Sequence, residues 1–261
     1  MNFYQPKTLP NLMVAPNGAR RTKSDHPAIP VTLEETAETA KRCHAAGAEA
    51  IHFHLRDDAQ QHILDAGLYK EGLAELYRQV PEMHLQITTE AVGRYSPEEM
   101  TKIIYDVMPP GISIGVAEMM PSRQPSADNL RLYQSLYEAG CRVQHLCYQP
   151  EDVDLLARLI SEVGLEDEKI WGMFVIGHYT GRVSHPDMIQ PFIERAAAHG
   201  LVLDWAVCAF AEQEHSCLEA AVSLGGKVRV GFENSMFMPD GTIAPDNETR
   251  IAAAHTLFER G

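Results

Sequence analysis

The chain has 261 residues, a formal net charge of −14 and five cysteines without CxxC spacing. An acidic surface repels nucleic-acid phosphates and anionic membranes, so we expect neither as a partner. The odd number of cysteines argues against a disulfide framework and a zinc ribbon, and no signal-peptide or membrane-spanning pattern is seen, so we expect a cytoplasmic protein.

Short apolar runs alternate with longer amphipathic segments along the whole chain. The runs are rich in Val, Ile and aromatic residues and too short for ordinary helices, which predicts buried strands at 11–17, 48–55, 84–89, 111–117, 141–148, 169–177, 201–210 and 228–233. Helices are predicted between and after them, near 33–46, 66–79, 97–107, 127–139, 151–163, 185–199, 213–224 and 245–259. Capping boxes begin the first and third of these helices, at Thr32 and Ser96.

Eight strand–helix units in succession predict a parallel sheet with helices outside it. Eight such units in a chain of this length favour a closed (β/α)8 TIM barrel that forms one domain over residues 1–261. An open doubly wound sheet is the alternative, although the chain lacks the G-x-G-x-x-G and Walker A fingerprints of nucleotide binding. In a barrel, chemistry lies at the C-terminal strand ends and the loops after them.

The second predicted strand ends with two histidines, His52 and His54. Residues two apart on a strand point to the same side, so both imidazoles are expected in the barrel mouth. A shared divalent metal would stabilise two buried histidines at this spacing, whereas the alternative is a hydrogen-bonded pair of core histidines. Glu233 ends the eighth predicted strand and is a plausible third ligand, although Glu90 and Glu118 also lie near strand ends. Such a set suits catalytic zinc as well as non-haem iron.

Several other polar residues fall at the predicted barrel mouth. Arg229 is predicted to share the inward face with Glu233, where it pairs with a core carboxylate or binds a substrate anion. Thr88, Thr89 and Ser113 are placed to hydrogen-bond a substrate oxyanion, although Thr is also a routine strand residue. Arg56 and Asp57 follow the histidines and are interpreted as a local ion pair; the alternative is that they orient a metal-ligating residue by hydrogen bonding to it.

Motifs spread over nearly the whole chain resemble those of the β-keto acid cleavage enzymes. The resemblance depends on their order and spacing rather than on any single piece. The matching segments are Ala15-Pro16-Asn17-Gly18-Ala19, Pro30-Val31-Thr32-x-x-Glu35, Ala45-Ala46-Gly47-Ala48, His52-x-His54-x-Arg56-Asp57, Gln86-Ile87-Thr88-Thr89 and Gly225-Gly226-x-Val228-Arg229-Val230-Gly231-x-Glu233.

This resemblance implies a TIM barrel that binds one zinc ion through His52, His54 and Glu233. It implies a reaction in which a β-keto acid condenses with acetyl-CoA and the product is cleaved to acetoacetate and a new acyl-CoA. It further implies a homo-oligomer, with a tetramer expected. The catalytic set is then Arg229, Asn234, Thr88 and Ser113, and the substrate contacts are Thr88, Thr89, Ser113, Arg20 and Glu118.

The sequence departs from the family pattern in three places. Asn234 stands where many members carry an aspartate that removes a proton, and a neutral amide cannot act as a base. Either another group is the base, with Glu90, Glu118 and Glu233 as the candidates, or the substrate carries its own base. Arg20 stands where a member acting on an amino-bearing substrate has Glu, so we expect a neutral or anionic substrate tail. The chain also stops at Gly261, where the family usually continues, so oligomer contacts made by that tail are expected to be missing.

Two competing functions share the same features. A metal-dependent hydrolase or decarboxylase would also place His-x-His after a barrel strand, but it would typically add later ligands, which His145, His178 and His215 do not supply convincingly. A non-catalytic metal-binding homologue is the second alternative, because Asn234 replaces the expected base. Dependence on acetyl-CoA separates the first competitor from the cleavage reaction, and activity on a panel of β-keto acids tests the second.

Overall fold

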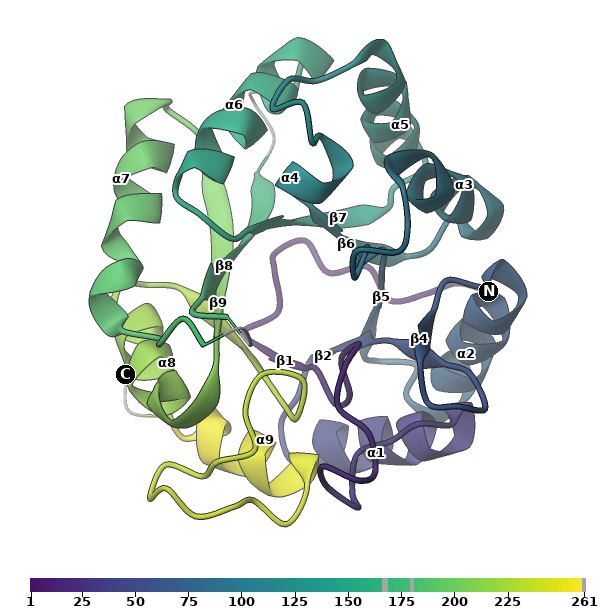
Figure 1. The fold of residues 1–261 in the computed structure, drawn as a ribbon, viewed down its shortest axis with the longest axis vertical. Helices are drawn as coiled ribbons and strands as arrows, with labels where there is room; N and C mark the ends of the chain where they lie inside the picture. The colour runs from purple at the N-terminus through teal and green to yellow at the C-terminus, as the bar shows by residue number, and fades with distance from the viewer. Residues whose placement is uncertain (166–168, 179–180, 260–261) are drawn as a thin grey trace.

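The computed structural model describes residues 1–165, 169–178 and 181–259. Within them, eight parallel strands close into a barrel surrounded by helices (Figure 1). The TIM-barrel prediction is confirmed and the open sheet is excluded, because the first strand pairs with both the second and the last. The barrel strands are β1 (Leu12–Val14), β2 (Ala50–Phe53), β5 (His84–Thr88), β6 (Gly111–Gly115), β7 (Arg142–Cys147), β8 (Ile170–Ile176), β9 (Leu203–Ala209) and β10 (Lys227–Val230).

Helices cover the outside of the barrel, and their apolar sides pack on the strands in one large core cluster. Both predicted capping boxes are present: the side chains of Thr32 and Ser96 accept hydrogen bonds from the amides of Glu35 and Glu99. The α-helices are α1 (Leu33–Ala45), α2 (Ala66–Gln79), α3 (Pro97–Val107), α4 (Val116–Met119), α5 (Ala127–Glu138), α6 (Glu151–Val163), α7 (Gln190–Ala198), α8 (Glu214–Ser223) and α9 (Asn247–His255), with 3-10 turns at Pro186–Met188 and Ala211–Gln213.

Two small elements at the barrel mouth were not predicted. The chain after β2 forms an antiparallel hairpin of β3 (Leu55–Arg56) and β4 (His62–Ile63) outside the barrel sheet. Helix α4 follows β6 directly and contains Glu118, which therefore lies in a helical turn rather than at a strand end.

The eighth barrel strand is shorter than predicted, because β10 ends at Val230. Gly231 follows with φ +153, and a Cβ atom there would lie 2.1 Å from the carbonyl oxygen of Ala15. A side chain at this position would collide with the first βα loop, so only glycine fits. The chain turns here, and Glu233 is carried by that turn instead of by the strand.

The interior of the barrel is divided between apolar and polar side chains. Residues of β7, β8 and β9 form an apolar cluster with Leu9 from the N-terminal segment, which runs behind the barrel in Figure 1. The Leu9 amide donates to Asp204 at 2.9 Å, and this contact anchors the segment. All five cysteines are buried and free. None of the helices in the described residues has both the length and the apolar character needed to cross a bilayer.

Candidate active site

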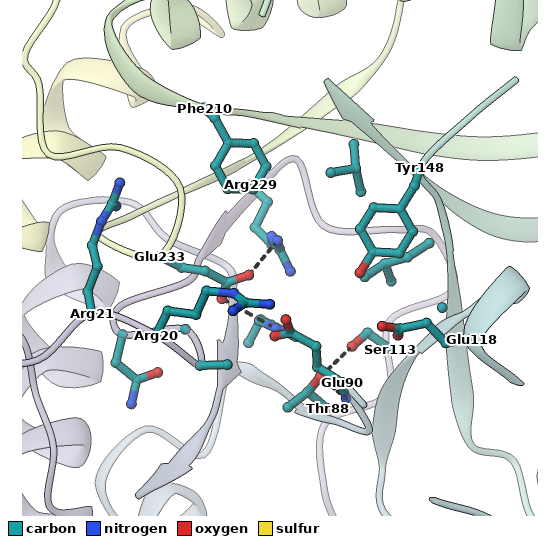
Figure 2. Close-up of a pocket in the computed structure, with 17 residues that line it drawn as sticks. Arg20, Arg21, Thr88, Glu90, Ser113, Glu118, Tyr148, Phe210, Arg229 and Glu233 are labelled. Carbon is teal, nitrogen blue, oxygen red and sulfur yellow. Dashed lines mark hydrogen bonds and ion pairs between the residues drawn. The ribbon is translucent and has the colours of Figure 1, made fainter. Parts of the chain in front are cut away.

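A pocket lies at the C-terminal ends of the barrel strands, where the sequence placed the chemistry. It is lined by side chains from six of the barrel strands and from the loops that follow them. In Figure 2, Arg20, Glu90, Glu118, Arg229 and Glu233 point toward a common space, whereas Arg21 points away from it. The pocket therefore brings several opposite charges together in a largely buried setting.

The structure brings His52, His54 and Glu233 together beside this space. The two Nε2 atoms are 3.1 Å apart. Oε2 of Glu233 lies 3.4 Å from Nε2 of His52 and 3.3 Å from Nε2 of His54. Both histidine side chains are almost completely buried, and the Glu233 side chain is 13% exposed. Three potential ligand atoms thus face a single point.

Hydrogen bonding determines which ring nitrogen of His52 carries the proton. Nδ1 of His52 lies 2.9 Å from Oε1 of Gln86, whose amide nitrogen donates to Gln144 at 3.1 Å. Because a carboxamide oxygen only accepts, Nδ1 of His52 is the donor, and its Nε2 presents a lone pair to His54 and Glu233. This is the arrangement by which a hydrogen-bonding partner orients a metal-ligating histidine.

The protonation states of the three residues also suit a cation. Burial lowers the pKa of His52 well below its usual value and that of His54 to about 4, so both rings are neutral near pH 7. Burial alone would raise the pKa of Glu233, but Arg229 and the two histidines outweigh it and hold that pKa well below its usual value. The set therefore offers two neutral lone pairs and one carboxylate, which are the forms a metal binds.

The spacing of these atoms provides a geometric test of metal binding. Ligand atoms around a tetrahedral zinc ion with bonds of about 2.1 Å lie roughly 3.4 Å from one another. The observed separations are 3.1, 3.3 and 3.4 Å. Oε2 of Glu233 is also buried without a hydrogen-bond partner among the described residues. The three residues fit a divalent metal ion, and two of them, His52 and Glu233, also line the pocket.

Arg229 fills the first of the two roles that its sequence position left open, pairing with a core carboxylate, and has donors that would serve the second. Its Nη2 contacts Oε1 of Glu233 at 2.7 Å and Sγ of Cys208 at 3.4 Å. Its Nε and Nη1 are buried and have no hydrogen-bond partner among the described residues. Buried donors without partners are costly, and a bound anion or carbonyl oxygen would satisfy them. Arg229 thus pairs with a core carboxylate on one side and keeps donors available on the other.

The three hydroxyl residues separate into two groups. Thr88 and Ser113 line the pocket, and their hydroxyl oxygens lie 3.4 Å apart on β5 and β6. Thr89 is absent from the lining, and its hydroxyl donates to the carbonyl of Ser113 at 3.3 Å. The expected substrate contact of Thr89 is therefore not seen, because the strand alternates sides and turns Thr89 outward.

Asn234 does not occupy the position expected of a catalytic residue. Its side chain is fully buried, has no hydrogen-bond partner among the described residues and is not part of the pocket lining. The expected ion pair of Arg56 with Asp57 is likewise replaced. Arg56 donates to backbone carbonyls, including those of Asn17 and Gln60, while Asp57 accepts from the amides of Ala59 and Gln61.

Glu118 and Arg20 both line the pocket, as the sequence suggested. Burial raises the pKa of Glu118 to about 7, against smaller opposing effects of the Ala91 amide and Arg20. A carboxyl group with this pKa exchanges protons readily near neutral pH. Glu90 lies on the other side of the cluster, with Oε2 3.8 Å from Nδ1 of His54.

Sequence reasoning assigned no role to several residues of the site. Gln86 lies inside a motif that was recognised, and its place two residues before Thr88 on β5 was the available signal for an inward-facing polar group. Asn17 and Arg21 belong to the first βα loop, and they contact the backbone of His54 and of the two residues that flank Glu233. Tyr148 and Phe210 form part of an apolar side of the pocket together with Leu146 and Val175.

Comparisons with known proteins place this arrangement in context. A 3-keto-5-aminohexanoate cleavage enzyme of Fusobacterium nucleatum subsp. nucleatum is 25% identical over 236 residues, covering 88% of this chain and 84% of the relative. A 3-oxoadipate:acetyl-CoA acetyltransferase of Cupriavidus necator is 21% identical over 253 residues, covering 95% and 88%.

A solved structure, the binary complex of ObcA with oxaloacetate, superposes with a TM-score of 0.72 at 17% identity, covering 90% of this chain. The alignment spans 64% of the ObcA chain, and because the identity is only 17%, this similarity shows the barrel fold alone. The sequence profile of the beta-keto acid cleavage enzymes matches residues 11–260. The chain therefore belongs to the beta-keto acid cleavage enzyme family.

Proposed function

We propose that this protein is a zinc-dependent enzyme that condenses a β-keto acid with acetyl-CoA and cleaves the product to acetoacetate and a new acyl-CoA. The observation that carries the proposal is the His52–His54–Glu233 cluster, which lies beside the unpartnered donors of Arg229 in a pocket at the barrel mouth. Family membership and relatives named for acetyl-CoA-dependent transfer support the same reaction class.

The metal and the surrounding side chains have separate tasks in this proposal. A divalent ion held by His52, His54 and Glu233 would act as a Lewis acid on the keto oxygen, which favours proton loss from the neighbouring carbon. Gln86 keeps Nε2 of His52 available as a ligand. The Nε and Nη1 groups of Arg229 bind an oxygen on which negative charge develops, where buried donors are most effective.

Substrate positioning and proton transfer fall to the opposite side of the pocket. The hydroxyls of Thr88 and Ser113 donate to the carboxylate of the β-keto acid. Glu118 takes the proton from the carbon between the two carbonyl groups, because its pKa of about 7 suits a general base. Asn234 has no part in this step, since it is an amide and lies outside the pocket.

The two substrates differ in shape, and the pocket has two kinds of wall. The polar wall carries the metal cluster and Arg229. The apolar wall consists of Leu146 on β7, Val175 on β8, and Tyr148 and Phe210, which directly follow β7 and β9. We place the largely uncharged arm of acetyl-CoA along this apolar wall and the β-keto acid against the polar one.

Arg20 determines the preferred tail of the β-keto acid in this proposal. Its side chain extends into the pocket in Figure 2, in a protein whose overall charge is strongly negative. A cation at this place favours neutral or anionic tails and repels an amino group. Steady-state comparison of amino-tailed, neutral and anionic β-keto acids tests this, and a clear preference for the amino-tailed compound would contradict it.

The first experiment combines elemental analysis of chelator-free protein with an acetyl-CoA consumption assay on a β-keto acid panel. We expect about one zinc per chain and formation of acyl-CoA that requires both substrates. Metal without dependence on acetyl-CoA would redirect the assignment to a hydrolase or decarboxylase. Metal without activity on any panel member would favour a non-catalytic homologue, and protein without metal would overturn the proposal.

A further inference from the structure

We infer that residues 17–21, the first βα loop, are a positioning frame that sets the spacing between His54 and Glu233 of the proposed metal site. The inference rests on the proposed function, because it concerns the ligands of that metal. It assigns a task to Asn17, Gly18 and Arg21, which donate no ligand atom themselves. Three independent contacts of the loop support it.

The first contact fixes the backbone of His54. Oδ1 of Asn17 accepts from the His54 amide at 3.2 Å, and Nδ2 of Asn17 donates to the His54 carbonyl at 3.0 Å and to that of Pro30 at 3.1 Å. Asn17 is 1% exposed, so water does not compete for these bonds. One carboxamide thus holds both polar groups of the peptide backbone at a ligand that lies just beyond β2.

The second contact fixes the turn that carries Glu233. The guanidinium of Arg21 donates to the carbonyl of Phe232 and, at 3.5 Å, to that of Asn234. These two residues flank Glu233 on either side. The turn lies beyond the end of β10, where the Glu233 amide donates to the carbonyl of Ala15 at 3.1 Å, and Arg21 adds two further bonds on either side of that contact.

The third contact is steric and involves Gly18. Its φ is +61, and a Cβ atom there would lie 2.5 Å from Cγ and 2.9 Å from Cβ of Glu233. The bare backbone of Gly18 therefore forms the surface against which the Glu233 side chain rests. Any side chain at this position would push the carboxylate away from the two histidines.

Arg56 fastens the frame to the β3–β4 hairpin. Its Nη2 donates to the carbonyls of Asn17 at 3.1 Å, of Gly18 and of Arg21 at 2.8 Å, and its Nη1 donates to that of Gln60 at 2.7 Å. One buried guanidinium thus binds carbonyls along nearly the whole loop. The frame contacts His54 through Asn17, Glu233 through Gly18, and the two residues that flank Glu233 through Arg21.

The test is the metal affinity of Gly18→Ala, compared with that of Gly140→Ala. Gly140 also has a positive φ, +73, but a Cβ atom there meets nothing within 4 Å, so the two variants share backbone strain and differ in the collision with Glu233. Zinc affinity is measured by chelator competition, and the visible spectrum of the cobalt-loaded protein reports ligand geometry. We expect Gly18→Ala to lose about 10- to 100-fold in affinity and to alter the spectrum, as for lost outer-shell support of a ligand.

A second pair of variants keeps the test decisive if Gly18→Ala folds poorly. Asn17→Leu removes the bonds to His54, whereas Asn129→Ala removes a buried asparagine that caps α5 and bonds to Ser126 and Met119 rather than to a ligand residue. We expect both to lower the unfolding temperature but only Asn17→Leu to weaken zinc binding by about 10-fold or more. Wild-type affinity in Gly18→Ala and Asn17→Leu would overturn this inference alone, whereas wild-type protein without metal would overturn the proposed function and the inference with it.

Discussion

Substituting Glu214 by Gln tests the energetics of the ion pair that ties α8 to α9. Glu214 on α8 pairs with Arg250 on α9, and both side chains are almost completely buried. Arg250 also donates to the carbonyls of Gly231 and Ser235, on either side of Glu233. Removing one partner of a buried pair costs about 3–5 kcal/mol, because the remaining charge is left without compensation. Glutamine keeps a neutral acceptor, so we expect the lower end, about 3 kcal/mol.

This loss converts into a measurable change in unfolding temperature. An unfolding entropy of roughly 2.1 cal/mol/K per residue amounts to about 0.5 kcal/mol/K for a chain of this length, so about 3 kcal/mol lowers Tm by about 6 °C. Thermal unfolding followed by circular dichroism measures it. The control is Glu219→Gln on the same helix. Glu219 pairs with His215 on the protein surface, and exposed ion pairs contribute little to stability.

A loss below about 1 kcal/mol for Glu214→Gln would refute the reasoning, since it would mean that the Arg250 charge is not effectively buried. A double variant, Glu214→Leu with Arg250→Met, separates charge from packing. With both charges removed, no charge is left unpaired, and we expect a loss of about 2 kcal/mol from the two carbonyl contacts of Arg250, which is smaller than the loss for Glu214→Gln alone. A double variant that is far less stable than Glu214→Gln would show that packing, not charge compensation, dominates at this site.

Three further predictions concern the active site. His52→Ala and His54→Ala should each lose bound metal and activity together, and stoichiometric metal in both by elemental analysis would contradict the ligand assignment. Asn234→Asp should lower Tm without raising kcat, because it places a charge in a buried position outside the pocket; increased turnover would identify a missing base there. Glu118 retains its proton in the folded state above its unfolded pKa, so the free energy of unfolding should fall as pH rises from about 4.5 to about 7. Glu118→Gln should remove this slope, and wild-type kcat/KM should rise with pH through about 7; an unchanged slope in the variant would disprove the assignment.

The barrel could be predicted because each strand and helix carries a local signal. Apolar runs and capping residues such as Thr32 and Ser96 depend on neighbours within a few positions, and these remained informative. The end of β10 was predicted three residues too late. The chain turns at Gly231, where it packs closely against Ala15, and Ala15 is far from Gly231 in the sequence. The β3–β4 hairpin was missed because its strands are two residues long and carry no periodicity.

The candidate site was predicted where it depends on local patterns, and missed where it depends on how the loops fold. His52 and His54 follow from a strand period of two, and Glu233 from barrel closure, so their meeting could be anticipated. Thr88 and Thr89 were both predicted to contact substrate, although adjacent residues of one extended segment point to opposite sides. Only Thr88 lines the pocket. The contacts of Asn17 and Arg21 depend on where the loops fold back, which no local pattern encodes. The tetramer and the cytoplasmic location stay predictions.

The five buried cysteines can report local opening of the structure through their reaction with thiol reagents. The thiolate is the species that reacts with alkylating reagents, and burial raises the pKa of Cys43, Cys141 and Cys217 to about 12 and those of Cys147 and Cys208 above their usual value. Modification must therefore wait for a fluctuation that exposes each thiol. Cys208 contacts Arg229 in the pocket, whereas Cys43 lies on α1. Labelling rates measured for each cysteine by mass spectrometry would therefore compare local opening at the barrel mouth with local opening of the outer helices, without any engineered probe.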